Sequence, residues 1–99
     1  MINIGLYYKV KSGHGKEFER IFEEVVRIFS GARGMRGAKL YREVGSDEYL
    51  IYSEWEDMNS FSGFVRSDEF KKVTGLGKEI IEGTPRHRVF AEMDLKGGH

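Results

Sequence analysis

The stretch Tyr52-Ser53-Glu54-Trp55-Glu56-Asp57 is the most informative part of this chain of 99 residues. This stretch closes a run of alternating residues that starts at Glu48, a pattern typical of a β-strand, and it ends in an aspartate that can cap a helix. After it, phenylalanines recur at helical spacing at Phe61, Phe64 and Phe70. The stretch therefore predicts a strand that runs directly into a helical region.

On both sides of this stretch, the periodicity predicts strands and helices in the order βαββαβ. This order predicts an α+β fold, a ferredoxin-like sandwich with an antiparallel four-stranded sheet. A chain of this length can build one core, so we expect one domain over residues 1–94 and a polar C-terminal tail over 95–99. Ser67 can start a new helix, so the second helical region should come in two pieces. The predicted elements are a strand over 2–11, a helix over 16–30, strands over 38–44 and 48–56, a helical region from 58 to a stop at Gly83-Thr84-Pro85, and a strand over 86–93.

Composition excludes several classes of function. Lys and Arg total 16 and Asp and Glu total 16. The chain therefore has no excess of positive charge that would favour binding to nucleic acid or to an anionic membrane. The chain has no cysteine, and no apolar run is long enough to span a bilayer, so a cytoplasmic protein is expected. Its histidines, His14, His87 and His99, lack the spacing of metal ligands. We therefore expect no metal.

The predicted strands carry apolar residues in both phases, although only one face of the sheet can lie under the helices. Leu6 and Trp55 share the phase expected to face the helices. The other phase would leave several aromatic rings bare, and a patch of that kind indicates a partner. We therefore predict a homodimer formed through the open face of the sheet. The residues of this open phase are Tyr7, Tyr41, Leu50, Tyr52 and Phe90.

Three residues are candidates for a site, each with a structural alternative. Trp55 can line a cavity and donate a hydrogen bond through its indole, or it can simply fill the core. His87 can act as an acid or base in a pocket, whereas a hydrogen-bonded structural histidine is the more common case. Tyr8 can hold a phenolic ligand, although tyrosine in strands also reflects β-propensity.

The run Glu54-Trp55-Glu56-Asp57, followed by Phe61, Ser67 and Phe70, resembles the antibiotic biosynthesis monooxygenase family. The run Tyr41-Arg42-Glu43 is also similar to that family, and the order of elements agrees over nearly the whole chain. The resemblance implies a dimeric α+β barrel. Some members oxygenate polycyclic phenols with molecular oxygen and without a metal or organic cofactor, and others open the porphyrin ring of bound heme.

Departures from the family pattern narrow this expectation. Many members carry a histidine in the second helix, three residues before the serine, where this chain has Phe64. The heme-degrading branch uses an asparagine on the first strand, a tryptophan in the second helix and a histidine ligand after it. The resemblance aligns Leu6, Phe64 and Thr74 with these positions. Without an axial histidine from this helix, heme degradation is disfavoured.

One class of function that remains is a cofactor-independent monooxygenase that uses molecular oxygen on a small aromatic, quinol-type substrate. The resemblance implies Trp55 as a pocket residue. The proposed oxygenation would also need other groups. Tyr8 is expected to line the pocket and donate a hydrogen bond, His87 to act as a base, and Arg42 to stabilise an oxyanion.

The other class is a non-catalytic dimeric barrel that binds a small hydrophobic molecule or serves as a stress or accessory protein. Leu6, Phe64 and Thr74 favour it, because these replacements make the expected pocket more apolar. In both classes Leu6, Phe61 and Phe64 are expected to contact the ligand. A cavity of a few hundred cubic ångströms between sheet and helices would favour a ligand, since this is the usual size of a ligand pocket.

Overall fold

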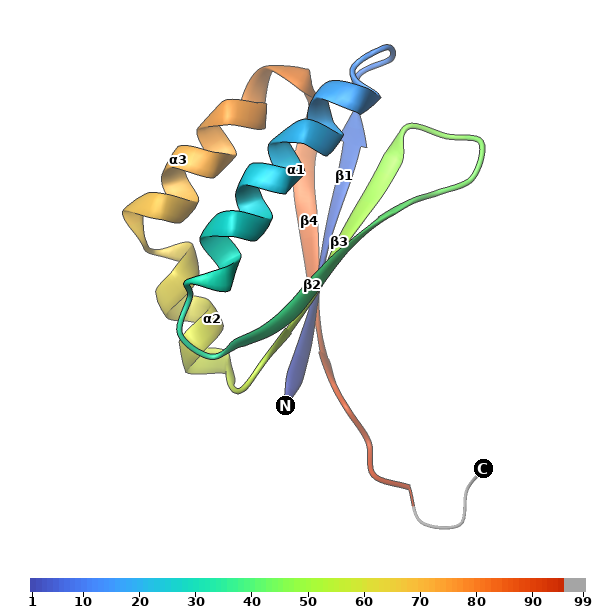
Figure 1. Cartoon of the computed structure of the whole chain (residues 1–99). Helices are drawn as coiled ribbons and strands as arrows, with labels where there is room; N and C mark the ends of the chain where they lie inside the picture. Colours follow the sequence, from blue (N-terminus) through green and yellow to red (C-terminus); the bar gives the residue numbers. More distant parts are fainter. Residues whose placement is uncertain (96–99) are drawn as a thin grey trace.

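The computed structural model describes residues 1–95, apart from the side chains of Val73, Thr74 and Leu76. The described chain forms one antiparallel sheet in the order β2-β3-β1-β4, with the helices packed on one face (Figure 1). The predicted α+β ferredoxin-like sandwich is confirmed. Of the predicted polar tail, residues 96–99 lie outside the described part. The elements are β1 (Ile2–Val10), α1 (Gly15–Ser30), β2 (Met35–Arg42), β3 (Glu48–Trp55), α2 (Met58–Val65), α3 (Asp68–Gly77), the 3-10 helix η1 (Lys78–Ile80) and β4 (Ile81–Ala91).

The central strands β1 and β3 set the register of the sheet. Leu6 of β1 lies opposite Ile51 of β3, and both side chains are buried under the helices. Tyr7 lies opposite Leu50 on the other face. Because side chains alternate along a strand, this pairing fixes which residues face the helices and which face outward.

The helical region after β3 is split into two pieces, as the sequence predicts. The Asp57 carboxylate accepts a hydrogen bond from the Ser60 amide at 2.8 Å and caps α2. The Ser67 hydroxyl accepts one from the Phe70 amide at 3.2 Å and caps α3. Each cap satisfies an amide that has no partner inside its helix.

The predicted bounds of two strands, β2 and β4, are wrong. β2 begins at Met35 and ends at Arg42, whereas the pattern suggested residues 38–44. β4 begins at Ile81, so Gly83-Thr84-Pro85 lies inside a strand and does not end the helical region. Proline is tolerated there because β4 is an edge strand, where one missing amide donor breaks few ladder bonds.

The core is centred on Trp55, which has no exposed surface. Its ring packs edge-on against Phe29 of α1 and Phe61 of α2, with centroids 6.0 and 5.5 Å away. Its indole N–H donates to the Ser53 hydroxyl at 2.9 Å, so the polar atom is satisfied inside the core. None of the helices in the described residues is long and apolar enough to cross a membrane.

Candidate functional site

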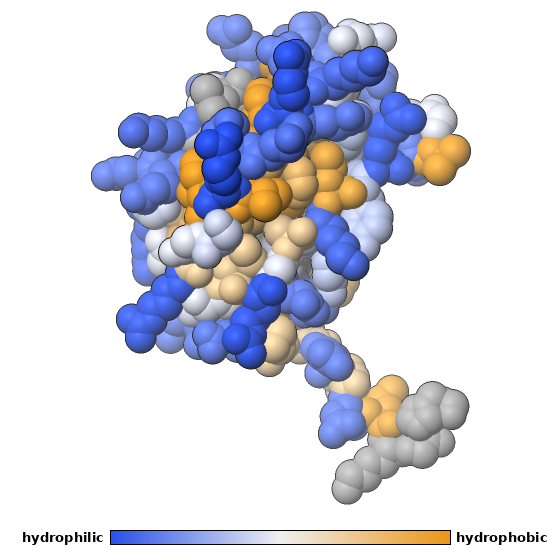
Figure 2. Space-filling model, in the orientation of Figure 1, coloured by the Kyte–Doolittle hydropathy of each residue, from blue (hydrophilic) through white to orange (hydrophobic). Residues whose placement is uncertain are grey.

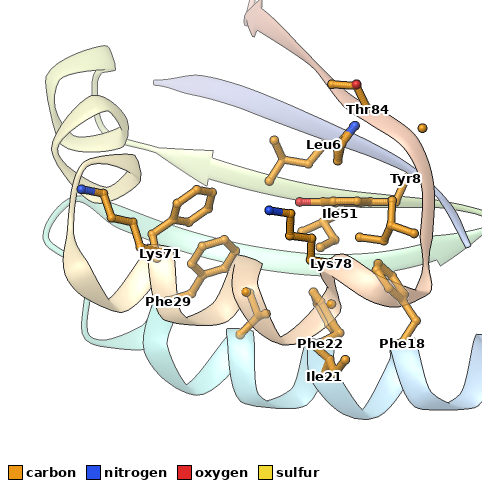
Figure 3. A pocket seen from close by; sticks show the side chains of 17 residues that line it. Leu6, Tyr8, Phe18, Ile21, Phe22, Phe29, Ile51, Lys71, Lys78 and Thr84 are labelled. Carbon is orange, nitrogen blue, oxygen red and sulfur yellow. The ribbon is translucent and has the colours of Figure 1, made fainter.

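A cavity of about 670 Å³ lies between the helix-covered face of the sheet, α1 and the α3–η1 segment. This volume falls within the range of about 300–1,000 Å³ that is typical of ligand pockets. The lining is mostly aliphatic and aromatic, and it comes from segments far apart in the sequence (Figure 3). Its apolar side chains include Leu6, Phe18, Ile21, Phe22, Val25, Phe29, Ile51, Phe70 and Ile81.

One rim of the cavity is shaped by an irregularity in β4. Tyr7 of β1 pairs with Arg86, but Lys9, two residues on, pairs with Glu82, so β4 carries extra residues at this point. Gly83 adopts φ +69° there, a conformation that favours glycine. The bulge turns Gly83, Thr84 and Pro85 toward the cavity, and bulges of this kind often occur beside functional sites.

Tyr8 provides a polar group in the cavity wall. Its ring packs against Phe18 with centroids 5.4 Å apart. Burial raises the pKa of the Tyr8 hydroxyl, so the group keeps its proton at neutral pH and acts as a hydrogen-bond donor. Within the described residues this hydroxyl has no hydrogen-bond partner, which leaves it available to a ligand.

Three further polar side chains line the cavity, namely Lys71, Lys78 and Thr84. Figure 3 shows Lys78 extending into the cavity on the side of Tyr8, whereas Lys71 extends to the opposite end. Thr84 lies on the β4 rim. No sequence motif points to Lys78 or Thr84. Thr84 stands between Gly83 and Pro85, a pattern that predicts the end of a helix but here belongs to a strand.

The structure divides the residues expected from the sequence into two groups. Leu6 and Tyr8 line the cavity. Trp55, Phe61 and Phe64 lie outside the lining and form an aromatic cluster behind it. Phe29 connects the two groups, because it lines the cavity and packs against both Trp55 and Phe64.

His87 and Arg42 do not line the cavity. His87 lies opposite Leu6 in the sheet, but it is exposed on the edge strand and borders a small hollow with Tyr7 and Arg88. Arg42 ends β2 and is exposed. Its charge acts on the neighbouring Tyr49, whose pKa is nevertheless raised by burial and by Glu19. Neither residue therefore joins Tyr8 in this cavity, although Arg42 and Tyr8 both border a separate hollow.

Comparison with curated proteins finds relatives that are much longer than this chain. One, from Natronomonas pharaonis, has a name that proposes heme binding, and it is 29% identical over 85 residues. Another, from Halobacterium salinarum, has a similar name and is 28% identical over 85 residues. Each match covers 85% of this chain but only 14% and 17% of the respective relative. The chain thus spans a small part of the proteins that it matches.

Comparison with solved structures supports the fold. A proposed antibiotic biosynthesis monooxygenase from Bordetella bronchiseptica superposes with a TM-score of 0.86 at 22% identity, covering 93% of this chain and 96% of the other. At such identities the likeness concerns the fold alone. The sequence model of antibiotic biosynthesis monooxygenases matches residues 1–75, from β1 into α3, which is most of the chain. By this match, the chain belongs to the antibiotic biosynthesis monooxygenase family.

Proposed function

We propose that this chain acts as a cofactor-independent monooxygenase domain on a small aromatic, quinol-type molecule held between the sheet and the helices. The observation that carries the proposal is the apolar cavity of about 670 Å³ with the Tyr8 hydroxyl in its wall. Its likeness in fold to SnoaB, a cofactor-independent oxygenase from Streptomyces nogalater, also supports it. That structure has a TM-score of 0.84 and is 21% identical, with 97% of this chain and 96% of the other covered.

For an anthrone-like phenol, the proposed reaction converts the ring CH₂ group and molecular oxygen into a ring carbonyl and water; for a hydroquinone, it converts a ring C–H group and oxygen into a hydroxyquinone and water. One oxygen atom enters the product and the other leaves as water, and the substrate supplies all the electrons. The apolar walls would exclude water and hold the ring in place, and the Tyr8 hydroxyl would donate a hydrogen bond to a ring oxygen. Trp55, His87 and Arg42 take no part in this proposal, because none of them lines the cavity.

The test is oxygen uptake by the purified chain with anthrone-like phenols and hydroquinones. Wild type should consume oxygen above background, and Tyr8→Phe should lower kcat/KM about tenfold, because a hydrogen bond of roughly 1.4 kcal/mol is lost. Tyr41→Phe is the matched control, since Tyr41 is exposed on β2 and away from the cavity. Absence of uptake with every substrate class, or equal loss in both variants, would contradict the proposal.

A second candidate function is binding without catalysis. It is favoured by the described lining, which contains neither a carboxylate nor an imidazole that could accept a proton. In that case the same aromatic compounds should bind with measurable affinity and oxygen uptake should stay at background. The two functions are therefore separated by one assay that follows binding and oxygen together.

Heme is the group that the names of the curated relatives suggest. The described side chains of the cavity do not fit its iron, since they include no histidine, cysteine or methionine. Tyr8 is the remaining oxygen donor of a kind known to ligate heme, but its raised pKa opposes the phenolate that such a bond requires. We therefore derive no step through heme.

We further propose that two copies pair through the open face of the sheet. Tyr41 and Phe90 on this face are 50% and 44% exposed, although both are large and apolar. The segment after β4 leaves the sheet and carries Met93 and Leu95, which are 71% and 62% exposed (Figure 1). Figure 2 shows an apolar side chain on this protruding segment, beyond the mainly hydrophilic surface of the body. A second copy would cover these side chains.

Leu50→Lys should prevent this pairing. Leu50 lies between Tyr7 and Tyr41 on the open face, so the variant would bury two like charges in a two-fold contact. We expect wild type to sediment as a dimer and the variant to dissociate about thirtyfold more readily or further, as for other central interface residues. Glu23→Lys on the exposed side of α1 is the control. A monomeric wild type at high concentration would refute the arrangement.

A further inference from the structure

We propose that the cavity selects ligands that carry a negative charge at one edge of an aromatic body, and that Lys78 is the residue that recognises the charge. This inference rests on the proposed function, because it concerns the same cavity. It adds the sign of the charge on the substrate, which the apolar lining alone does not define.

The charges around the cavity have one sign. Among its described lining residues the charged side chains are Lys71 and Lys78, and no carboxylate is present. The carboxylates nearest to Lys78 in the sequence, Glu79 and Glu82, do not line the cavity. Glu82 instead borders a hollow that also includes Arg86. A ligand on the Tyr8 side of the cavity therefore meets the positive charge of Lys78, and no carboxylate of the described lining neutralises that charge.

Lys78 lies where it can contact a ligand and Tyr8 together. It begins η1, where the chain passes from α3 toward β4, and its side chain is exposed. Figure 3 shows it extending into the cavity on the side of Tyr8. Within the described residues Lys78 forms no ion pair, so no carboxylate among them neutralises its charge.

The polar groups of the cavity can all donate hydrogen bonds. The Lys78 ammonium has only donors, the Tyr8 hydroxyl keeps its proton, and the Thr84 hydroxyl can donate as well. An anionic oxygen can accept hydrogen bonds from the Lys78 ammonium and the Tyr8 hydroxyl, whereas a cationic ligand would be repelled by Lys78. Thr84 lies apart from these two groups on the β4 rim (Figure 3). Because the Lys78 side chain is exposed, solvent and salt screen its attraction for an anion, so the expected preference for an anion is modest.

The charge also bears on the proposed reaction. No lining carboxylate or imidazole is available to remove a proton from the substrate. A neighbouring ammonium favours the ionised form of a ring hydroxyl, because an opposite charge within a few ångströms lowers the pKa of an acid. Lys78 would therefore help to provide the electron-rich anion that reduces oxygen. In this scheme the proton leaves to solvent.

A matched pair of fluorescent probes tests the inference. Anilinonaphthalene sulfonate carries one negative charge, and N-phenylnaphthylamine has the same ring system without it. Wild type should bind the sulfonate about five- to tenfold more tightly, and salt should weaken only this binding. Lys78→Met should remove the difference while leaving the affinity for the neutral probe within about twofold, and Lys78→Arg should retain it.

Two controls locate the binding. Lys72→Met removes an exposed lysine of α3 that does not line the cavity, and it should change neither affinity. Val25→Phe places a ring in the cavity and should weaken both probes, with circular dichroism confirming that the variant is folded. Equal affinity of the two probes, or equal loss of both in Lys78→Met, would overturn the inference alone. Failure of both probes to bind, or no effect of Val25→Phe on either affinity, would overturn the proposed function as well.

Discussion

Trp55→Ala is expected to lower the free energy of unfolding by about 3–5 kcal/mol, the usual cost of removing a large buried ring. Trp55 has no exposed surface, and its ring contacts Phe29, Phe61 and Phe64 at centroid distances of 6.0, 5.5 and 5.4 Å. These contacts join α1 and α2 to the end of β3. A domain of this size is stable by only about 5–15 kcal/mol, so the variant should unfold at a much lower denaturant concentration.

Denaturation followed by far-UV circular dichroism measures this loss, since Trp55 is the single tryptophan and its fluorescence is lost in the variant. Trp55→Phe should cost less, because it keeps a ring but leaves the Ser53 hydroxyl without its partner. Val44→Ala is the control, since Val44 is 96% exposed and its replacement should change stability by less than about 0.5 kcal/mol. A loss below about 1 kcal/mol in Trp55→Ala would show that this ring does not anchor the core.

This result bears on how the site is built. The aromatic cluster does not line the cavity, but Phe29 belongs to both the cluster and the lining. Trp55 therefore supports the cavity wall through Phe29 without facing the ligand. A Trp55→Phe variant that is folded should keep its affinity for ligands, whereas Tyr8→Phe should lose affinity without losing comparable stability.

The fold could be predicted from the sequence because its signals are local. Alternation over Glu48–Trp55 defines a strand, and Asp57 and Ser67 are capping residues whose side chains accept the expected bonds. The alternation along the first strand also predicts correctly that Leu6 faces the helices and that Tyr7 faces the other side of the sheet. These patterns depend on residues within a few positions of one another, and the structure keeps the predicted order of elements while shifting boundaries and adding η1 and the β4 bulge.

The site could be predicted only in part, because its residues come together through tertiary packing. Lys78 and Thr84 lie beyond any family motif, at a helix end and at a strand bulge that faces β1. The bulge depends on pairing between β1 and β4, and no local pattern reports that pairing. Trp55 illustrates the opposite error, since the most distinctive residue of the motif fills the core. The proline at Pro85 is a strong local signal, but its effect depends on β4 being an edge strand.

Gly34→Ala should be the most damaging of the glycine substitutions, at a cost of about 2–5 kcal/mol from backbone strain and overpacking together. Gly34 has φ +84°, and a Cβ atom there would lie 2.3 Å from the Ser60 Oγ and 2.5 Å from its Cβ. The backbone cannot easily move away, since the Gly34 carbonyl accepts a hydrogen bond from the Glu56 amide at 2.8 Å. This contact fastens the α1–β2 connection to the corner between β3 and α2.

Gly45→Ala separates the two components of this cost. Gly45 has φ +82°, almost the same backbone conformation, but a Cβ atom there would meet nothing within 4 Å. Its replacement should cost only the strain of the left-handed conformation, about 1–2 kcal/mol. Adding Ser60→Gly to Gly34→Ala should recover the part due to the clash, as a double-mutant cycle would measure. If Gly34→Ala and Gly45→Ala cost the same, the close approach of Gly34 to Ser60 does not constrain the fold, and the corner beside Trp55 must be held by the aromatic contacts alone.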